Sequence, residues 1–189
     1  MALVAAVLVP VKAFDRAKVR LAPALPAPER AALARVMAEG VLRAAGDLRC
    51  AVVCDDPAVA DWARAQGVEV VWAPGRGLNG AVQHGVEHLA ASGVDHVTVA
   101  HSDLPLADDL TWVARFAGVT IVPDRHDKGS NVVGVPTAAG FRFAYGAGSF
   151  ARHCAEARRL RLALRISRRA PLTWDVDVPA DLDYSRRAS

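Results

Sequence analysis

Two lysines fall within one short polar segment, and their spacing is the first feature of the sequence that points to chemistry. The chain contains three lysines, Lys12, Lys18 and Lys128, and arginine supplies its other strongly basic side chains. Lys12 and Lys18 follow an apolar run that ends at Pro10. Because a lysine ammonium is a compact charge suited to phosphate, this segment is predicted to hold a triphosphate and to stabilise a leaving pyrophosphate. An exposed basic loop is the alternative, and a P-loop is excluded because the sequence has no Gly-Lys-Ser/Thr element.

Carboxylates at two places in the chain predict a metal site. Asp103 directly follows a predicted strand, where a carboxylate is well placed to bind a hard cation such as Mg²⁺. Asp175 and Asp177 alternate along an extended segment and therefore share one face. They would complete the site with Asp103, although acids in a surface turn are the alternative. Asp108 and Asp109 fit helix caps better than metal ligands.

Two further polar clusters are candidates for anion binding. Residues 123–131 place charges, a glycine and a hydroxyl between two predicted strands, which suits either a backbone-amide anion site or a plain hairpin loop. Residues 145–150 place Gly146, Gly148 and Ser149 before a helical stretch that is predicted to begin at Ala151. Amides at a helix start can surround a phosphate, but an ordinary N-cap has the same pattern.

The elements that position these residues alternate between strands and helices. Strands are predicted at 4–9, 51–54, 68–72, 96–100, 119–122 and 131–135, and apolar residues recur at helical spacing from 28, at 59–66 and at 78–89. Alternation of this kind implies mostly parallel pairing with right-handed crossovers. The prediction is an α/β fold, a three-layer α/β/α sandwich with a Rossmann-like, mostly parallel sheet, and its ligands are expected beyond the carboxyl ends of the strands.

Composition is that of a folded globular protein, with 52% hydrophobic and 23% charged residues over 189 positions, and one domain spanning 1–189 is expected.

The apolar N-terminus lacks a basic leader and is too short for a membrane span, so a cytoplasmic protein without a membrane partner is expected. A net charge of +3 does not by itself indicate nucleic acid. Cys50, Cys54 and Cys154 form no zinc pattern and are predicted to be inert core thiols.

An arginine run near the end of the chain is predicted to be a solvated helix end and edge strand, with phosphate contact as the alternative. Scattered aromatics, 6% of the chain, give no stacking platform for single-stranded nucleic acid. The run comprises Arg158, Arg159, Arg161, Arg165, Arg168 and Arg169.

Taken in order along nearly the whole chain, the motifs resemble one family, the guanylyltransferases of deazaflavin coenzyme (F420) biosynthesis, which act on 2-phospholactate or phosphoenolpyruvate. Its wider relatives include the molybdenum cofactor guanylyltransferase. The resemblance is carried by Val9-Pro10-Val11-Lys12, Lys18-Val19-Arg20-Leu21-Ala22-Pro23, Gly77-Leu78-Asn79, Ser102-Asp103-Leu104-Pro105, Pro123-Asp124-Arg125, Gly129-Ser130-Asn131, Gly146 to Phe150 and Asp175-Val176-Asp177-Val178-Pro179.

The resemblance implies a sheet of the nucleotide-diphospho-sugar transferase type, GTP and Mg²⁺ as requirements, and pyrophosphate as a product. It also implies a role for each matched residue. Lys12, Lys18 and Asp103 would be catalytic, Asp103 and Asp177 would bind the metal, and Ser130, Gly146 and Ser149 would hold the acceptor. The nucleotide would be bound by Pro10, Lys12, Lys18, Arg20, Asn79 and Asp103.

The resulting prediction is a guanylyltransferase that moves GMP from GTP to a small phosphorylated acid, with phosphoenolpyruvate favoured on family grounds over 2-phospholactate or 3-phosphoglycerate. A molybdopterin or sugar-phosphate nucleotidyltransferase, and a GTP-binding domain without turnover, are the alternatives. GTP and the acid are the expected partners, without nucleic acid, and an exposed edge strand would permit a homodimer.

Overall fold

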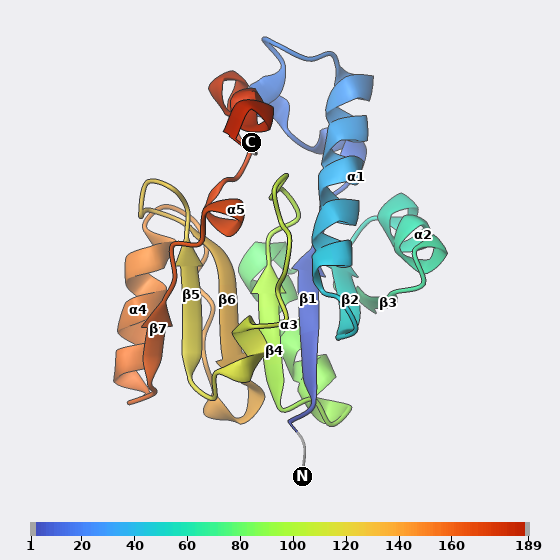
Figure 1. Ribbon diagram of the computed structural model, residues 1–189. Helices are drawn as coiled ribbons and strands as arrows, with labels where there is room; N and C mark the ends of the chain where they lie inside the picture. The colour runs from blue at the N-terminus through green and yellow to red at the C-terminus, as the bar shows by residue number, and fades with distance from the viewer. Residues whose placement is uncertain (1–2, 188–189) are drawn as a thin grey trace.

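The computed structural model describes residues 3–187 and shows one seven-stranded sheet in the order β3-β2-β1-β4-β6-β5-β7 (Figure 1). Parallel pairing joins β3, β2, β1 and β4. The strands are β1 (Ala5–Pro10), β2 (Arg49–Cys54), β3 (Glu69–Trp72), β4 (His96–Ala100), β5 (Val119–Pro123), β6 (Ser130–Pro136) and β7 (Leu164–Ile166).

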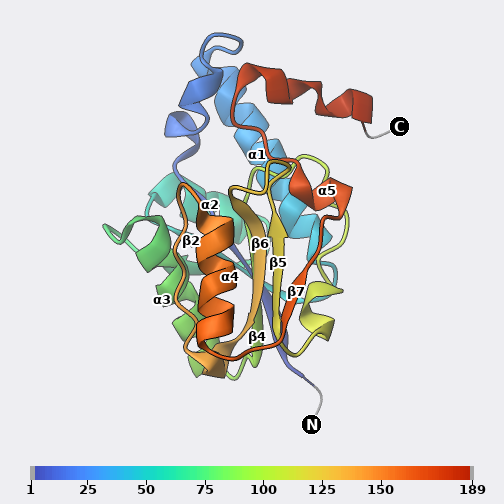
Figure 2. The same ribbon diagram turned by 90° about the vertical axis from the view of Figure 1, so that its left-hand side faces the viewer.

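Helices cover both faces of the sheet, which confirms the predicted sandwich. The side chains of α3 and α4 enter one buried apolar cluster, and those of α1, α2 and α5 enter another. In Figure 2, α3 and α4 lie to the left of the sheet and α5 to the right. The helices are α1 (Ala27–Ala44), α2 (Pro57–Ala65), α3 (Gly77–Ala91), α4 (Ser149–Arg159) and α5 (Ala170–Thr173).

The central strands form where the sequence is continuously apolar, as expected for strands covered on both faces. Residues 6–9 of β1 and the whole of β4 are buried. Helix α3 approaches β1 closely because Gly85 carries no side chain; a Cβ there would lie 2.6 Å from Leu8 Cδ2. Helix α2 is capped by Asp56, whose Oδ1 accepts a hydrogen bond of 3.1 Å from Val59 N.

Strand β6 departs from the expected parallel pattern. It pairs antiparallel with both β4 and β5. Only a short loop joins β5 to β6, and parallel neighbours need a much longer crossover, so the two strands form a hairpin. A hairpin was one of the two alternatives for residues 123–131 and is present, and the anion site that was the other alternative stays a prediction.

Two local predictions were wrong. Asp108 and Asp109 cap no helix, because Asp109 Oδ1 accepts from Thr111 N at 2.8 Å and the next helical turn, Val113–Arg115, has no side-chain cap. Helix α4 begins at Ser149 and not at Ala151, since Gly148 adopts the left-handed conformation (φ 74°) that starts it.

The arginine run lies at the end of α4 and along the edge strand β7, as predicted. Arg168 pairs with Asp127 at 2.9 Å and Arg169 with Asp108 at 2.6 Å, both on the surface. Arg165 is different, because its guanidinium lies 4.7 Å from the ring centroids of both Trp112 and Phe116. Across residues 3–187, no helix is long and apolar enough to cross a bilayer.

Candidate active site

A cavity of about 750 Å³ opens at the carboxyl ends of the central strands, where β1 has β2 on one side and β4 on the other. This is the topological switch point at which open α/β sheets bind ligands, and the volume suits a nucleotide-sized molecule. Its walls come from segments that follow β1, β2, β4 and β5, together with the start of α3 and the residues after α5.

Most of the predicted site residues line this one cavity. The acceptor candidates reach it from β6 and from the start of α4, and the phosphate and metal candidates reach it from the segments after β1 and β4 and near the C-terminus. The predicted residues in the wall are Pro10, Lys12, Lys18, Arg20, Asp103, Ser130, Gly146, Ser149 and Asp177.

Asn79 is the exception. Its carboxamide faces the Tyr145 backbone, accepting from Tyr145 N at 2.6 Å and donating to Tyr145 O at 3.3 Å. Asn79 therefore fixes Tyr145, which does line the cavity. The predicted contact between Asn79 and a nucleoside stays a prediction.

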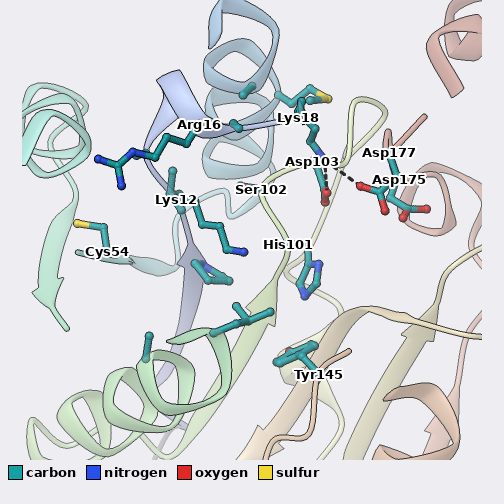
Figure 3. A pocket seen from close by; sticks show the side chains of 18 of the residues that line it. Lys12, Arg16, Lys18, Cys54, His101, Ser102, Asp103, Tyr145, Asp175 and Asp177 are labelled. Atoms are coloured by element: carbon teal, nitrogen blue, oxygen red, sulfur yellow. Dashed lines mark hydrogen bonds and ion pairs between the residues drawn. The ribbon is translucent and has the colours of Figure 1, made fainter. Parts of the chain in front are cut away.

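The basic segment after β1 is held by two apolar anchors. It folds into two short 3₁₀ turns, Phe14–Arg16 and Val19–Leu21. Phe14 is buried with its ring edge against Trp62, 5.1 Å between centroids, and Leu21 is fully buried in a small cluster. Between these anchors Arg16, Lys18 and Arg20 line the cavity. Lys12, which precedes the first anchor, extends its ammonium into the same cavity (Figure 3).

Lys18 joins the two predicted metal ligands. Its Nζ lies 2.6 Å from Asp103 Oδ2 and 3.3 Å from Asp177 Oδ1 (Figure 3). The backbone of Lys18 is left-handed (φ 55°), a strained conformation for a residue with a side chain and one that recurs at functional sites. Burial alone would lower the pKa of Lys18, but attraction to Asp103 and then to Asp177 outweighs it, so the pKa is raised and the ammonium stays charged.

Asp103 is kept ionised by the same pairing that keeps Lys18 charged. Burial is the largest single influence and favours the protonated acid, but the charges of Lys18 and His101 and the hydrogen bond from Lys18 together outweigh it and lower the pKa of Asp103. The side chain is 18% exposed and that of Lys18 is 12% exposed, so water screens this pair only partly.

The carboxylates fit a magnesium ion that shares its coordination with a substrate. Asp103 Oδ1 is buried and has no hydrogen-bond partner among the described residues, which leaves one oxygen of the buried acid available. Over residues 3–187, no three acidic, imidazole or thiol groups converge as a preformed metal cage. Mg²⁺ commonly uses one or two carboxylates together with water and substrate phosphates, so Asp103 and Asp177 are a sufficient protein contribution.

Sequence reasoning missed the support behind Asp177. The Arg125 guanidinium donates to Asp175 O at 3.1 Å, forms an ion pair with Asp181 and lies 4.3 Å from the Trp174 ring centroid. Asp181 Oδ2 in turn accepts from Asp177 N at 2.7 Å. These contacts fix the extended segment that presents Asp177.

Asp175 is the second acid of that segment and also lines the cavity. Burial, followed by repulsion from Asp103 and Asp177, raises the pKa of Asp175 to about 6. Three carboxyl groups therefore lie close together at this part of the wall, an arrangement whose negative charge a cation would offset.

Another part of the cavity wall, here called the acceptor wall, carries the predicted acceptor residues Ser130, Gly146 and Ser149. Ser130 N donates to Ser149 Oγ at 3.0 Å, which brings the start of β6 to the start of α4. Asp124 organises the loop before Ser130, because its carboxylate accepts from the backbone N–H groups of His126, Lys128 and Gly129. His101, which the sequence did not single out, also lines the cavity, with its ring centroid 4.9 Å from that of Tyr145.

An α/β sheet with a nucleotide-sized cavity at its switch point, lined by lysines and paired aspartates, is typical of the nucleotide-binding α/β class. The fold is similar to that of a Desulfovibrio desulfuricans structure assigned to the nucleotide-diphospho-sugar transferases, with a TM-score of 0.75 at 20% identity, covering 98% of this chain and 87% of the other.

Residues 5–184 match the family described as guanylyl transferase CofC like, and the chain belongs to that family. A phosphoenolpyruvate guanylyltransferase of Sphaerobacter thermophilus is 37% identical over 93% of this chain and 89% of its own length. A 2-phospho-L-lactate guanylyltransferase of Methanothermobacter thermautotrophicus is 32% identical over 93% of this chain and 81% of its own. These findings confirm the family predicted from the motifs.

Proposed function

We propose that the protein transfers GMP from GTP to phosphoenolpyruvate and releases pyrophosphate, as a step in coenzyme F420 biosynthesis. One observation carries the proposal: a single cavity is lined by Lys12, Lys18, Asp103 and Asp177 and also by Ser130 and Ser149 of the acceptor wall. Such a cavity has cationic groups for a phosphate chain and separate donors for a second anion.

The reaction balances without a protein nucleophile. A phosphate oxygen of the acid attacks the α-phosphorus of GTP, the bond to the β-phosphate oxygen breaks, and pyrophosphate leaves with that electron pair. Lys12 and Lys18 neutralise the charge that moves onto the leaving group. The acceptor wall holds the acid so that its phosphate oxygen attacks in line with the bond that breaks. Magnesium, held by Asp103 and Asp177, would add positive charge at the phosphates.

Phosphoenolpyruvate is favoured over 2-phospholactate by the relatives. The phosphoenolpyruvate guanylyltransferase of Sphaerobacter thermophilus is 37% identical to this chain, and the 2-phospho-L-lactate enzyme of Methanothermobacter thermautotrophicus is 32% identical. Both acids carry one phosphate and one carboxylate, so a few contacts at the acceptor wall decide between them.

The test is pyrophosphate release from GTP and Mg²⁺ with phosphoenolpyruvate, 2-phospholactate and 3-phosphoglycerate in turn. A downstream deazaflavin acceptor is included to consume the product. We expect the highest kcat/KM with phosphoenolpyruvate and a loss of activity in Asp103→Asn. Asp108→Asn is the matched control, because Asp108 is an exposed acid paired with Arg169 outside the cavity.

Other outcomes separate the rivals. A preference for 2-phospholactate would keep the reaction and change the acceptor. If no pyrophosphate were released with any of the three acids, despite measurable GTP binding, the proposed reaction would be contradicted. It would favour another acceptor or a domain that binds GTP without turnover.

A further inference from the structure

His153 is a buried titratable side chain that the proposed reaction does not use. It lies on α4, is fully buried, and does not line the cavity. Its ring makes two hydrogen bonds on opposite sides: Ala144 N donates to Nε2 at 2.9 Å, and Nδ1 lies 3.0 Å from Ser130 Oγ. His153 therefore stands directly behind a residue of the acceptor wall.

The contact with Ala144 fixes where the imidazole proton sits. A backbone N–H can only donate, so Nε2 must present its lone pair and carry no proton. A neutral imidazole has one N–H, which must then be on Nδ1. Nδ1 consequently donates to Ser130 Oγ, and the serine oxygen is the acceptor in that bond.

As a consequence, the hydroxyl group of Ser130 can still donate a hydrogen bond. Its oxygen is engaged by His153, and no acceptor for its own O–H is found among the described residues. Its backbone N–H is also occupied, by Ser149 Oγ at 3.0 Å. Because Ser130 lines the cavity, the remaining donor is available to a ligand there.

We propose that His153 is a positioning residue which, by donating from Nδ1 to Ser130 Oγ, makes the Ser130 hydroxyl a dedicated hydrogen-bond donor to an anionic group of the phosphorylated acid. This inference rests on the proposed function, because it assigns the ligand of the acceptor wall. It adds that a residue outside the cavity sets the direction of one of its hydroxyls.

The surroundings of His153 maintain the neutral ring. The rings of Tyr145, Phe141 and Phe143 lie with centroids 4.8, 5.9 and 6.2 Å from it. Burial, followed by repulsion from His101 and Arg152, lowers the pKa of His153 to about 4, against a smaller opposing attraction to Glu156. A protonated ring would also lose the bond from Ala144, since Nε2 could no longer accept.

If His153 served only to stabilise the fold, the direction of its hydrogen bond to Ser130 would not matter for binding the acid. A pair of variants distinguishes this structural role from the proposed positioning role. The carboxamide of Asn ends near the position of histidine Nδ1, and that of Gln ends near Nε2. His153→Asn thus keeps a donor to Ser130 and loses the acceptor for Ala144, whereas His153→Gln does the reverse. Each variant loses one buried hydrogen bond, so they are matched in expected stability cost.

The measurement is KM for phosphoenolpyruvate and for GTP, with kcat, for the wild type and both variants. We expect His153→Gln to raise KM for the acid about ten-fold, as for the loss of one hydrogen bond to a charged group, and His153→Asn to raise it less than three-fold. KM for GTP should change little in either. In a Ser130→Ala background the difference between Asn and Gln should disappear. If the two variants raised KM for phosphoenolpyruvate equally, or if His153→Asn raised it more, the proposal would be overturned. The role of His153 would then be to hold the backbone at Ala144.

A second measurement does not depend on the reaction. Nitrogen NMR of ¹⁵N-histidine protein, assigned with His153→Gln, should show a protonated Nδ1 and an unprotonated Nε2 at neutral pH. The opposite tautomer would overturn the proposal even if transfer is observed. Absence of transfer with every acid, with the expected tautomer present, would instead count against the proposed function; binding of phosphoenolpyruvate that is weaker in Gln than in Asn would then still support the role of His153.

Discussion

Replacing Arg125 with methionine tests whether the C-terminal segment is held in place as the contacts indicate. Methionine keeps much of the apolar stem and removes the guanidinium. The change deletes the ion pair with Asp181, the 3.1 Å bond to Asp175 O and the stacking on Trp174. Asp181, whose side chain is 4% exposed, would be left without its cationic partner.

The cost follows from burial. Removing one partner of a buried ion pair costs about 3–5 kcal/mol. Asp181 Oδ2 keeps its two backbone donors, Asp177 N at 2.7 Å and Val178 N at 2.8 Å, and the Arg125 side chain is 23% exposed. The lower end, about 3 kcal/mol of unfolding free energy, is therefore expected. With a urea m-value of about 2 kcal/mol/M, the midpoint should fall by about 1.5 M.

The matched control is Arg168→Met, which removes an ion pair to Asp127 whose side chains are 57% and 47% exposed. A surface pair of this kind contributes little to stability, because water screens both charges. Urea unfolding should separate the two variants clearly, and hydrogen exchange at Asp177 N and Val178 N should accelerate only in Arg125→Met. Equal midpoints together with unchanged exchange would refute the reasoning, because Arg125 would then hold nothing that Arg168 does not.

Three further outcomes are expected. Asp103→Asn should lower kcat for pyrophosphate release by about 10²–10³-fold or more, since a charged group at the phosphates is lost, and a fall below ten-fold would contradict its role. The pKa of His153 is about 4 against an ordinary 6.5, so its stabilising effect is present above pH 6.5 and is lost as the pH falls toward 4. Between pH 7 and 5 the wild type should lose about 2 kcal/mol more unfolding free energy than His153→Gln, measured by urea titration at each pH. Gly85→Ala should destabilise by about 1–3 kcal/mol in thermal unfolding, because its Cβ would lie 2.6 Å from Leu8 Cδ2; an unchanged Tm would show that β1 and α3 can move apart freely.

The part of the site that could be predicted from the sequence is the part that follows strand ends. Lys12 and Asp103 come after continuous apolar runs, and such runs can be recognised as buried parallel strands. Strands β1 and β4 turn out to be neighbours, in register from Ala5 opposite His96, so their carboxyl ends deliver both residues to one place. The rule that ligands bind at that edge was sufficient for these positions.

Residues whose role depends on a specific side-chain partner could not be found this way. Asn79 was matched by its motif, and the pairing of its carboxamide with the Tyr145 backbone has no signature in the sequence. His153 reads in sequence as an ordinary helical histidine. Its function depends on Ala144 and Ser130, which are brought to it by tertiary packing, and hydrogen-bond direction is visible only once both contacts are known.

Asp177 shows how the two kinds of residue combine. It follows no strand of the sheet, yet it lies 3.3 Å from the ammonium of Lys18, which is 159 positions away. Asp103 O accepts from Val176 N at 3.2 Å, and Asp181 accepts from Asp177 N, so Asp177 is held between the loop after β4 and the contacts of Arg125. The acids could be named from sequence because their types and alternation suggest a metal. The position of Asp177 beside Lys18 is supported by Arg125, a residue of the hairpin whose partners Asp175 and Asp181 lie 50 and 56 positions further on. The hairpin therefore helps to position the charges of the site, and substitutions at Arg125 should lower the rate of pyrophosphate release even though Arg125 does not line the cavity.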